Sequence, residues 1–168
     1  MKNIFLSAVV ATATLVSCST VSSILQNTFP YNATVLVTSG SPANTTLSSV
    51  SAAQSINQLT GAGANVKDIR ISNATLSVNS STSVGLFKSV KVYLSNNGSN
   101  EVLVASREDI PDNVGSSLSL DVSTSATLDN MMKSGSVQQR FVYVLKKSPT
   151  SDVSVKTSIG FSSLPITN

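Results

Sequence analysis

The sequence predicts an all-β domain, a seven- to eight-stranded antiparallel β-sandwich with one or two short helices between strands. Three observations lead to this fold class. Ser, Thr, Asn and Val dominate the chain, and only 11% of its 168 residues are charged, a composition typical of strands rather than helices. Segments of alternating apolar and polar residues recur along the chain. Turn residues separate these segments at intervals of about ten to fifteen residues, as in a sandwich.

The first half of the chain contains three strand patterns in which apolar residues alternate with polar ones. They are Tyr31–Thr38, the weaker Thr46–Val50 and the long Asn65–Val78. The long pattern changes phase, because Ile69 and Ile71 share one parity whereas the apolar residues from Ala74 onward take the other. A β-bulge or a break near Ser72 and Asn73 would permit this change.

A hairpin is predicted over residues 88–105. Its two strands, Val90–Leu94 and Glu101–Ala105, are separated by Asn97 and Gly98, residues that tolerate a positive φ. Three further strands are predicted after the hairpin. They are the alternating Leu118–Val122, the central strand Phe141–Leu145, which is apolar on both parities, and Val153–Phe161.

Two short helices are predicted between the strands. They are Gln54–Thr60 and Thr127–Ser134, of which the second ends at a C-capping Gly135. We expect Met131 and Met132 of the second helix to fill the core rather than a ligand site. An immunoglobulin-like arrangement is favoured for the sandwich. It is an analogy of architecture only, because the diagnostic Cys…Trp…Cys pattern is absent from the sequence.

The first residues have the pattern of a secretion signal. A basic start at Lys2 precedes the apolar segment Ile4–Val16. Thirteen helical residues would span about 20 Å, less than the roughly 30 Å hydrocarbon core of a membrane, so a signal is favoured over a transmembrane anchor. The segment ends in Leu15-Val16-Ser17-Cys18. An ordinary cleavable signal, cut for instance after Ala13, is the alternative.

The run Leu15-Val16-Ser17-Cys18 resembles the lipobox of bacterial lipoproteins, and the resemblance covers the first eighteen residues. It implies that residues 1–17 are removed and that the thiol of Cys18, the only cysteine, carries a diacylglyceryl group. In that family an Asp after the cysteine often retains the protein at the inner membrane, and here Ser19 follows. The resemblance therefore implies a lipid-anchored protein of the bacterial cell envelope, at the outer membrane and facing the periplasm.

Composition and motifs exclude several kinds of chemistry. The chain has no histidine, so it has no His-based triad and no histidine metal site. No phosphate-binding loop of the Walker type occurs. The net charge is +3, or near +2 without Lys2, and the basic residues are scattered, which argues against nucleic acid as a partner. We expect no cofactor and no enzymatic activity.

Two weak candidate sites remain. Glu108, Asp109 and Asp112 could supply oxygen ligands to calcium, but they match no known loop spacing, and a solvated turn is the favoured interpretation. The same carboxylates could form a glycosidase acid/base pair, but nothing near them suggests a substrate cleft. Tyr93 lies on the polar parity of its strand and is a candidate for stacking against a sugar.

Lys146 and Lys147 lie at a strand end beside a proline turn. We expect these two lysines to be exposed charges that keep the protein soluble. The alternative is that they contact lipid headgroups or an anionic glycan.

These observations divide the chain into a signal (1–17), a lipidated Cys18 with a tether (18–29), and a sandwich (30–168). We expect a non-enzymatic structural or interaction role, with the membrane as partner through the lipid on Cys18. The alternatives are an adhesin-like module that binds glycan or an envelope protein, and a subunit of a surface fibre. A missing core strand or an uncovered edge would favour the fibre.

Overall fold

The structure is a computed structural model that describes residues 28–55, 58–59, 66–79 and 81–166. The signal segment, Cys18 and nearly all of the tether lie outside the described residues. The strands are β1 (Phe29–Val37), β2 (Thr46–Val50), β3 (Gln54–Ser55), β4 (Val66–Val78), β5 (Phe87–Asn96), β6 (Ser99–Arg107), β7 (Ser117–Ser119), β8 (Asp121–Val122), β9 (Ser136–Leu145) and β10 (Val153–Pro165). A 3-10 helix, η1 (Val84–Leu86), precedes β5, and the α-helix α2 (Asp129–Lys133) precedes β9.

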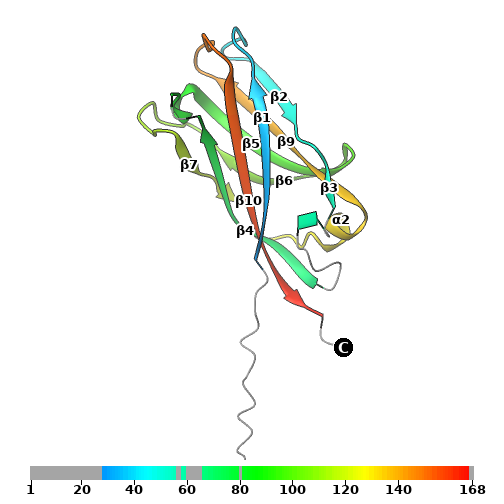
Figure 1. The fold of residues 1–168 in the computed structure, drawn as a ribbon. Helices are drawn as coiled ribbons and strands as arrows, with labels where there is room; N and C mark the ends of the chain where they lie inside the picture. Colours follow the sequence, from blue (N-terminus) through cyan, green and yellow to red (C-terminus); the bar gives the residue numbers. More distant parts are fainter. Residues whose placement is uncertain (1–27, 56–57, 60–65, 80, 167–168) are drawn as a thin grey trace, which may run out of the picture.

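The strands form two antiparallel sheets that pack face to face (Figure 1). One sheet has the order β1-β10-β4-β7, and the other has the order β2-β9-β5-β6-β8, with β3 paired to the end of β9. The predicted all-β sandwich is therefore confirmed.

The order of the strands is that of a jelly roll. Eight of the described strands have three or more residues, and numbering those eight along the chain gives the orders 1-8-3-6 and 2-7-4-5. In a jelly roll the first strand pairs with the last and the second with the one before it, so the chain is wound as a double strand. An immunoglobulin domain instead pairs its first two strands and places its last strand in the other sheet. The sandwich differs in this respect from the immunoglobulin-like arrangement that the sequence favoured.

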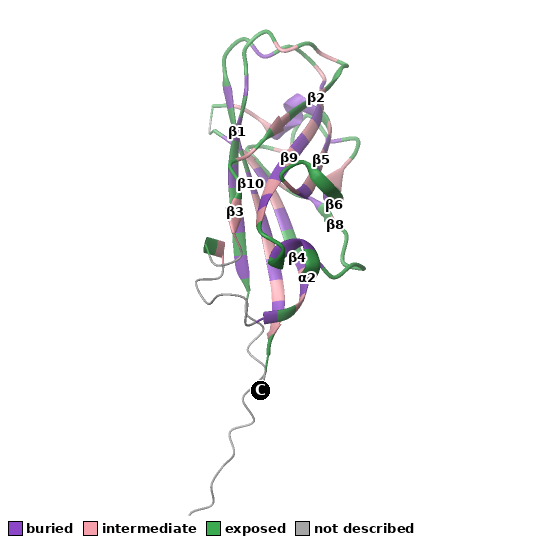
Figure 2. Ribbon diagram, turned by 90° about the vertical axis from the view of Figure 1, so that its right-hand side faces the viewer, coloured by how far each residue is buried: buried purple, intermediate pink, exposed green. Residues whose placement is uncertain are grey.

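The inward faces of both sheets form one apolar core, visible as alternating purple positions in Figure 2. In β1 every second residue from Phe29 to Val37 is buried, as the alternation predicts. Phe141 of β9 lies at the centre of an aromatic cluster. Its ring meets Phe87 edge-on at 5.8 Å between centroids and stacks on Tyr143 at 5.2 Å.

The phase change in β4 is confirmed and has the predicted cause. Ser72 and Asn73 are both exposed, and the pairing with β10 skips one residue there, since Ile71 faces Phe161 whereas Asn73 faces Gly160. The bulge lets both halves of the strand direct their apolar side chains into the core. The predicted hairpin is confirmed as well, with Asn97 and Gly98 at φ values of 48° and 80°.

Two segments differ from the sequence expectation. The predicted strand over residues 118–122 is divided at Leu120, with β7 pairing to β4 in one sheet and β8 pairing to β6 in the other. Gln54 and Ser55 were expected to begin a helix but form β3. The rest of that predicted helix falls mostly outside the described residues. The second predicted helix is present as α2, and both of its methionines are buried.

A buried polar network of Tyr31, Gln139 and Thr157 joins the two sheets. Gln139 of β9 donates its amide Nε2–H to the carbonyl oxygen of Tyr31 in β1 at 2.9 Å, and its Oε1 accepts from the hydroxyl of Thr157 in β10 at 2.5 Å. The single O–H of Tyr31 is shared between the carbonyl oxygens of Ala52, at 2.8 Å, and Val137, at 3.1 Å. Buried polar groups are stable when they are paired in this way.

The pairing of β1 with β10 places Phe29 beside Phe161, so Thr28 and Ile166 lie at the same end of the sandwich. We call the opposite end, where β1 ends and β10 begins, the far end. The loops at the far end are residues 38–45, 81–86, 108–116 and 146–152. Among the described residues no helix is long and apolar enough to cross a membrane.

Candidate functional site: a polar cleft at the far end

The loops of the far end enclose a cleft of about 570 Å³. Three segments that are distant in sequence line it. They are residues 81–83 with Gly85 and Leu86 before β5, Asp112 in the loop after β6, and residues 146–151 with Val153 between β9 and the start of β10. The jelly-roll order brings these segments together, because β4, β6 and β9 all end at the far end of the sandwich.

Backbone hydrogen bonds between the loops fix the walls of the cleft. The amide of Lys146 donates to the carbonyl oxygen of Leu86 at 2.9 Å, and the amide of Gly40 donates to that of Pro149 at 2.9 Å. The side chain of Asp152 accepts from the amide of Ser39 at 2.8 Å. A site that is already formed loses little conformational freedom when a ligand binds.

Gly85 allows the closest approach between two of the walls. A Cβ at this position would lie 2.4 Å from the carbonyl oxygen of Asp112. No side chain fits in that space, so glycine is required for the contact between η1 and the loop after β6.

Lys146 and Asp112 form an ion pair at the rim of the cleft. The ammonium of Lys146 donates to the carbonyl oxygen of Ile110 at 2.5 Å and to the carboxylate of Asp112. The hydrogen bond from Lys146, followed by the charges of Lys146 and Lys147, lowers the pKa of the Asp112 carboxyl. Lys146 is thus occupied by protein groups.

Lys147 and four hydroxyl groups of the lining have no partner within the described part of the chain. Lys147 is exposed and forms no hydrogen bond or ion pair there, and its charge acts on Asp112 only through space. The four unpaired hydroxyls belong to Thr82, Ser148, Thr150 and Ser151. The cleft therefore offers one free cation and a set of groups that can both donate and accept hydrogen bonds.

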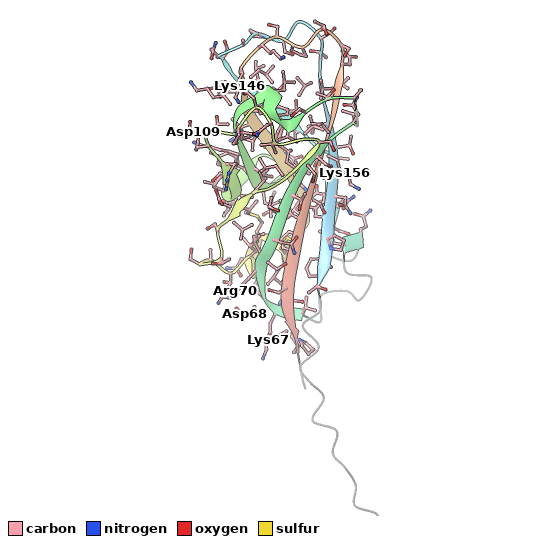
Figure 3. All side chains as sticks on the ribbon, turned by 90° about the vertical axis from the view of Figure 1, so that its left-hand side faces the viewer. Lys67, Asp68, Arg70, Asp109, Lys146 and Lys156 are labelled. Atoms are coloured by element: carbon pink, nitrogen blue, oxygen red, sulfur yellow. The ribbon has the colours of Figure 1, made fainter. Side chains whose placement is uncertain are left out.

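The structure places the predicted acidic residues apart from one another. Glu108 pairs with Lys91 of β5 at 3.2 Å, and Asp112 pairs with Lys146. Asp109 has a positive φ of 48° and lies at the far end with Lys146 (Figure 3). Among the described residues no three acidic, histidine or cysteine side chains are grouped to hold a metal ion. Only Asp112 of the three lines the cleft.

Tyr93 lies outside the cleft, on the outer face of the second sheet. It is half-buried, and the guanidinium of Arg140 lies over its ring at 4.6 Å from the centroid. Arg140 in turn forms an ion pair with Glu101, and this contact lowers the pKa of the Glu101 carboxyl and raises that of Arg140. The cation covers one face of the ring, which is then not open to stacking by a sugar.

No family model and no curated protein matches this chain. Among solved structures, a chain of Desmodium yellow mottle tymovirus is similar over 84% of this chain and 89% of that chain, at 10% sequence identity and a TM-score of 0.23. A similarity of this size supports no argument about fold or function.

Sequence reasoning did not find the cleft. Its lining is mostly serine and threonine, which are too common in this chain to form a distinct pattern. The signal that was available is the pair Lys146-Lys147 at a strand end, followed by a Ser-Pro turn. Only the fold shows that one of these lysines is paired and the other is free.

Proposed function

We propose that this chain is a lipid-anchored protein of the bacterial cell envelope with a non-enzymatic interaction role. The lipid on Cys18 would hold it at the outer membrane, on the periplasmic side, and the jelly roll would present its far end to a partner. The observation that carries the proposal is the position of the cleft. It lies at the end of the sandwich opposite Thr28, the first described residue after the tether.

The length of the sandwich supports this arrangement. Strand β10 runs the whole way from the far end to the tether end, and its thirteen residues cover about 40 Å at about 3.3 Å per residue. A lipid at the tether end would leave the cleft that far from the lipid. The loops that line the cleft would then be free to meet a partner.

The chemistry of the cleft supports binding rather than catalysis. The lining contains one carboxylate, that of Asp112, and Lys146 already holds it. Acid–base hydrolysis of a glycoside uses two carboxyl groups that flank the bond. The described lining offers hydroxyls and an ammonium group instead.

A binding module has more support than a fibre subunit. A fibre subunit that accepts a strand from its neighbour would lack a core strand. Here all eight positions of the jelly roll are filled by described strands, so a missing core strand does not support the fibre, although β1 and β2 each have one edge that no described strand covers.

Metabolic labelling with a palmitate analogue tests the anchor. The wild-type chain should incorporate the label and fractionate with membranes, and Cys18→Ser should abolish both. The matched control is Ser17→Ala, which keeps a small residue before the cysteine and should be labelled normally. Equal labelling of the Cys18→Ser variant would refute the lipid anchor.

A further inference from the structure

We infer that the far-end cleft binds an acidic saccharide, a sugar chain carrying a carboxylate or sulfate group, with Lys147 as the residue that contacts the acidic group. The inference rests on the proposed function for the exposure of the far end. The ligand class itself follows from the lining of the cleft, the free charge and the size of the site.

The charge of the cleft favours an anion. Its lining contains two lysines and one carboxylate, and Lys146 and Asp112 neutralise each other. Lys147 remains as an unpaired positive charge. A charge-assisted hydrogen bond from an ammonium group is about twice as strong as a neutral one, so an anionic group gains most at this position.

The size of the cleft excludes an inorganic anion as the sole ligand. A volume of about 570 Å³ lies in the range of roughly 300–1,000 Å³ that sites for small organic molecules have. A lone sulfate or phosphate would occupy a small part of this space and would leave most of the lining hydrated.

The unpaired hydroxyls favour a sugar over other anionic molecules. Those of Thr82, Ser148, Thr150 and Ser151 can each donate and accept. Sugar hydroxyls have the same dual capacity and match such a surface. The described residues that line the cleft include no aromatic one. Binding would therefore depend on hydrogen bonds and charge rather than on stacking, and we expect it to weaken as the salt concentration rises.

Calorimetric titration of the full-length lipoprotein tests the inference. The protein is kept in a polyoxyethylene detergent, because a detergent with a sugar headgroup would compete for the cleft. The probes are a galacturonate trisaccharide, the corresponding neutral galactose trisaccharide, inorganic sulfate and a glutamate hexapeptide. We expect the galacturonate trisaccharide to bind more tightly than the other three.

Three variants locate the binding site. Lys147→Gln should weaken binding of the galacturonate trisaccharide by about tenfold or more, the value of one charge-assisted hydrogen bond, and Thr150→Val should weaken it less. The matched control is Lys67→Gln, an exposed lysine at the tether end, labelled far from Lys146 in Figure 3, which should bind as the wild type does. Lys147 forms no hydrogen bond or ion pair with the described residues and acts on the exposed Asp112 only through space, so its substitution should barely change the melting temperature, and an unchanged value would show that the variant is folded.

Several results would overturn the inference. They are the absence of galacturonate binding, equal affinities of the Lys147→Gln and Lys67→Gln proteins, or binding of sulfate, neutral trisaccharide or acidic peptide at least as tight as that of galacturonate. Palmitate labelling of the same preparation separates the two proposals. Labelled protein that fails to bind would refute the saccharide alone, whereas unlabelled protein that binds would refute the anchor alone.

Discussion

Replacing Gln139 with leucine tests whether the buried polar network between the sheets stabilises the fold. The exposed fraction of Gln139 is 1%. Within the network, the amide group of its side chain bonds to both Tyr31 of β1 and Thr157 of β10. Leucine has a similar size but no polar atoms. The substitution therefore removes two hydrogen bonds with little change in packing volume.

The expected cost follows from the groups left behind. The Tyr31 carbonyl oxygen loses its donor, and the Thr157 hydroxyl keeps only a contact of 3.5 Å with the carbonyl oxygen of Ala33. Each orphaned buried group costs about 1–3 kcal/mol, and the apolar leucine regains about 1 kcal/mol. We expect the free energy of unfolding to fall by about 1–5 kcal/mol.

Urea denaturation followed by far-ultraviolet circular dichroism measures this change, in the chain lacking residues 1–18. The matched control is Gln138→Leu, on the outer face of the same strand. Gln138 is half-buried, and its side chain forms no hydrogen bond with the described residues. That change should cost within about 0.5 kcal/mol.

A double-mutant cycle tests the coupling. The pair Gln139→Leu with Thr157→Val should cost at least about 0.5 kcal/mol less than the sum of the two single changes, because it leaves fewer orphaned groups. Equal costs for Gln138→Leu and Gln139→Leu, or strictly additive costs in the cycle, would refute the reasoning.

Three further predictions concern the core, the cleft and the acidic loop. Phe141→Ala should lower the free energy of unfolding by about 3–5 kcal/mol, because the residue is 1% exposed and lies in an aromatic cluster. Lys91→Ala should change the free energy of unfolding by no more than about 0.5 kcal/mol. Urea denaturation measures both changes, and the reverse ranking would contradict the burial pattern. Gly85→Ala should destabilise the domain by at least about 1 kcal/mol, because the added methyl group would clash with Asp112. The control is Gly40→Ala, where the methyl group has open space but φ is +75°, so that it reports the cost of backbone strain alone. Equal melting temperatures for the Gly85→Ala variant and the wild type would contradict the close contact. Millimolar calcium should leave the melting temperature unchanged, because Glu108 pairs with Lys91 and Asp112 pairs with Lys146. A calcium ion bound at one hundred times its dissociation constant would instead add about 2.7 kcal/mol to the free energy of unfolding. A rise of several degrees that Asp109→Asn abolishes would support a calcium site after all.

Local patterns predicted the strands well because most strands here have one face in the core and one face in water. That asymmetry makes burial alternate with period two, and even the bulge in β4 is visible as a change of parity. Segments of only two or three residues are too short for such an alternation to show which sheet they join. The stretch around Leu120 shows three alternating apolar residues, and nothing local indicates that the chain leaves one sheet for the other between them.

The order of the strands could not be predicted because it depends on contacts between distant residues. The pairing of β1 with β10 joins residues more than one hundred positions apart, as in Tyr31 with Ile159. Both a jelly roll and an immunoglobulin domain present the same alternation in each strand. The candidate site has the same limitation, since the partners of the acidic residues lie on other parts of the chain, Lys91 in β5 and Lys146 in the loop after β9.

The jelly-roll order itself places the N-terminal side of the sandwich and the cleft at opposite ends. Because the first and last strands pair antiparallel, Thr28 and Ile166 are forced to the same end of the sandwich. The turn that leads from β9 into β10 must then lie at the other end, together with the turns before β2 and β5. The turns before β2 and between β9 and β10, residues 38–45 and 146–152, contribute no apolar side chain to the core and can vary in sequence with little effect on it, whereas the turn before β5 contributes Val84 and Leu86. An anchor on the N-terminal side of Thr28 would therefore leave the loop that carries Lys147 at the end of the sandwich away from the lipid.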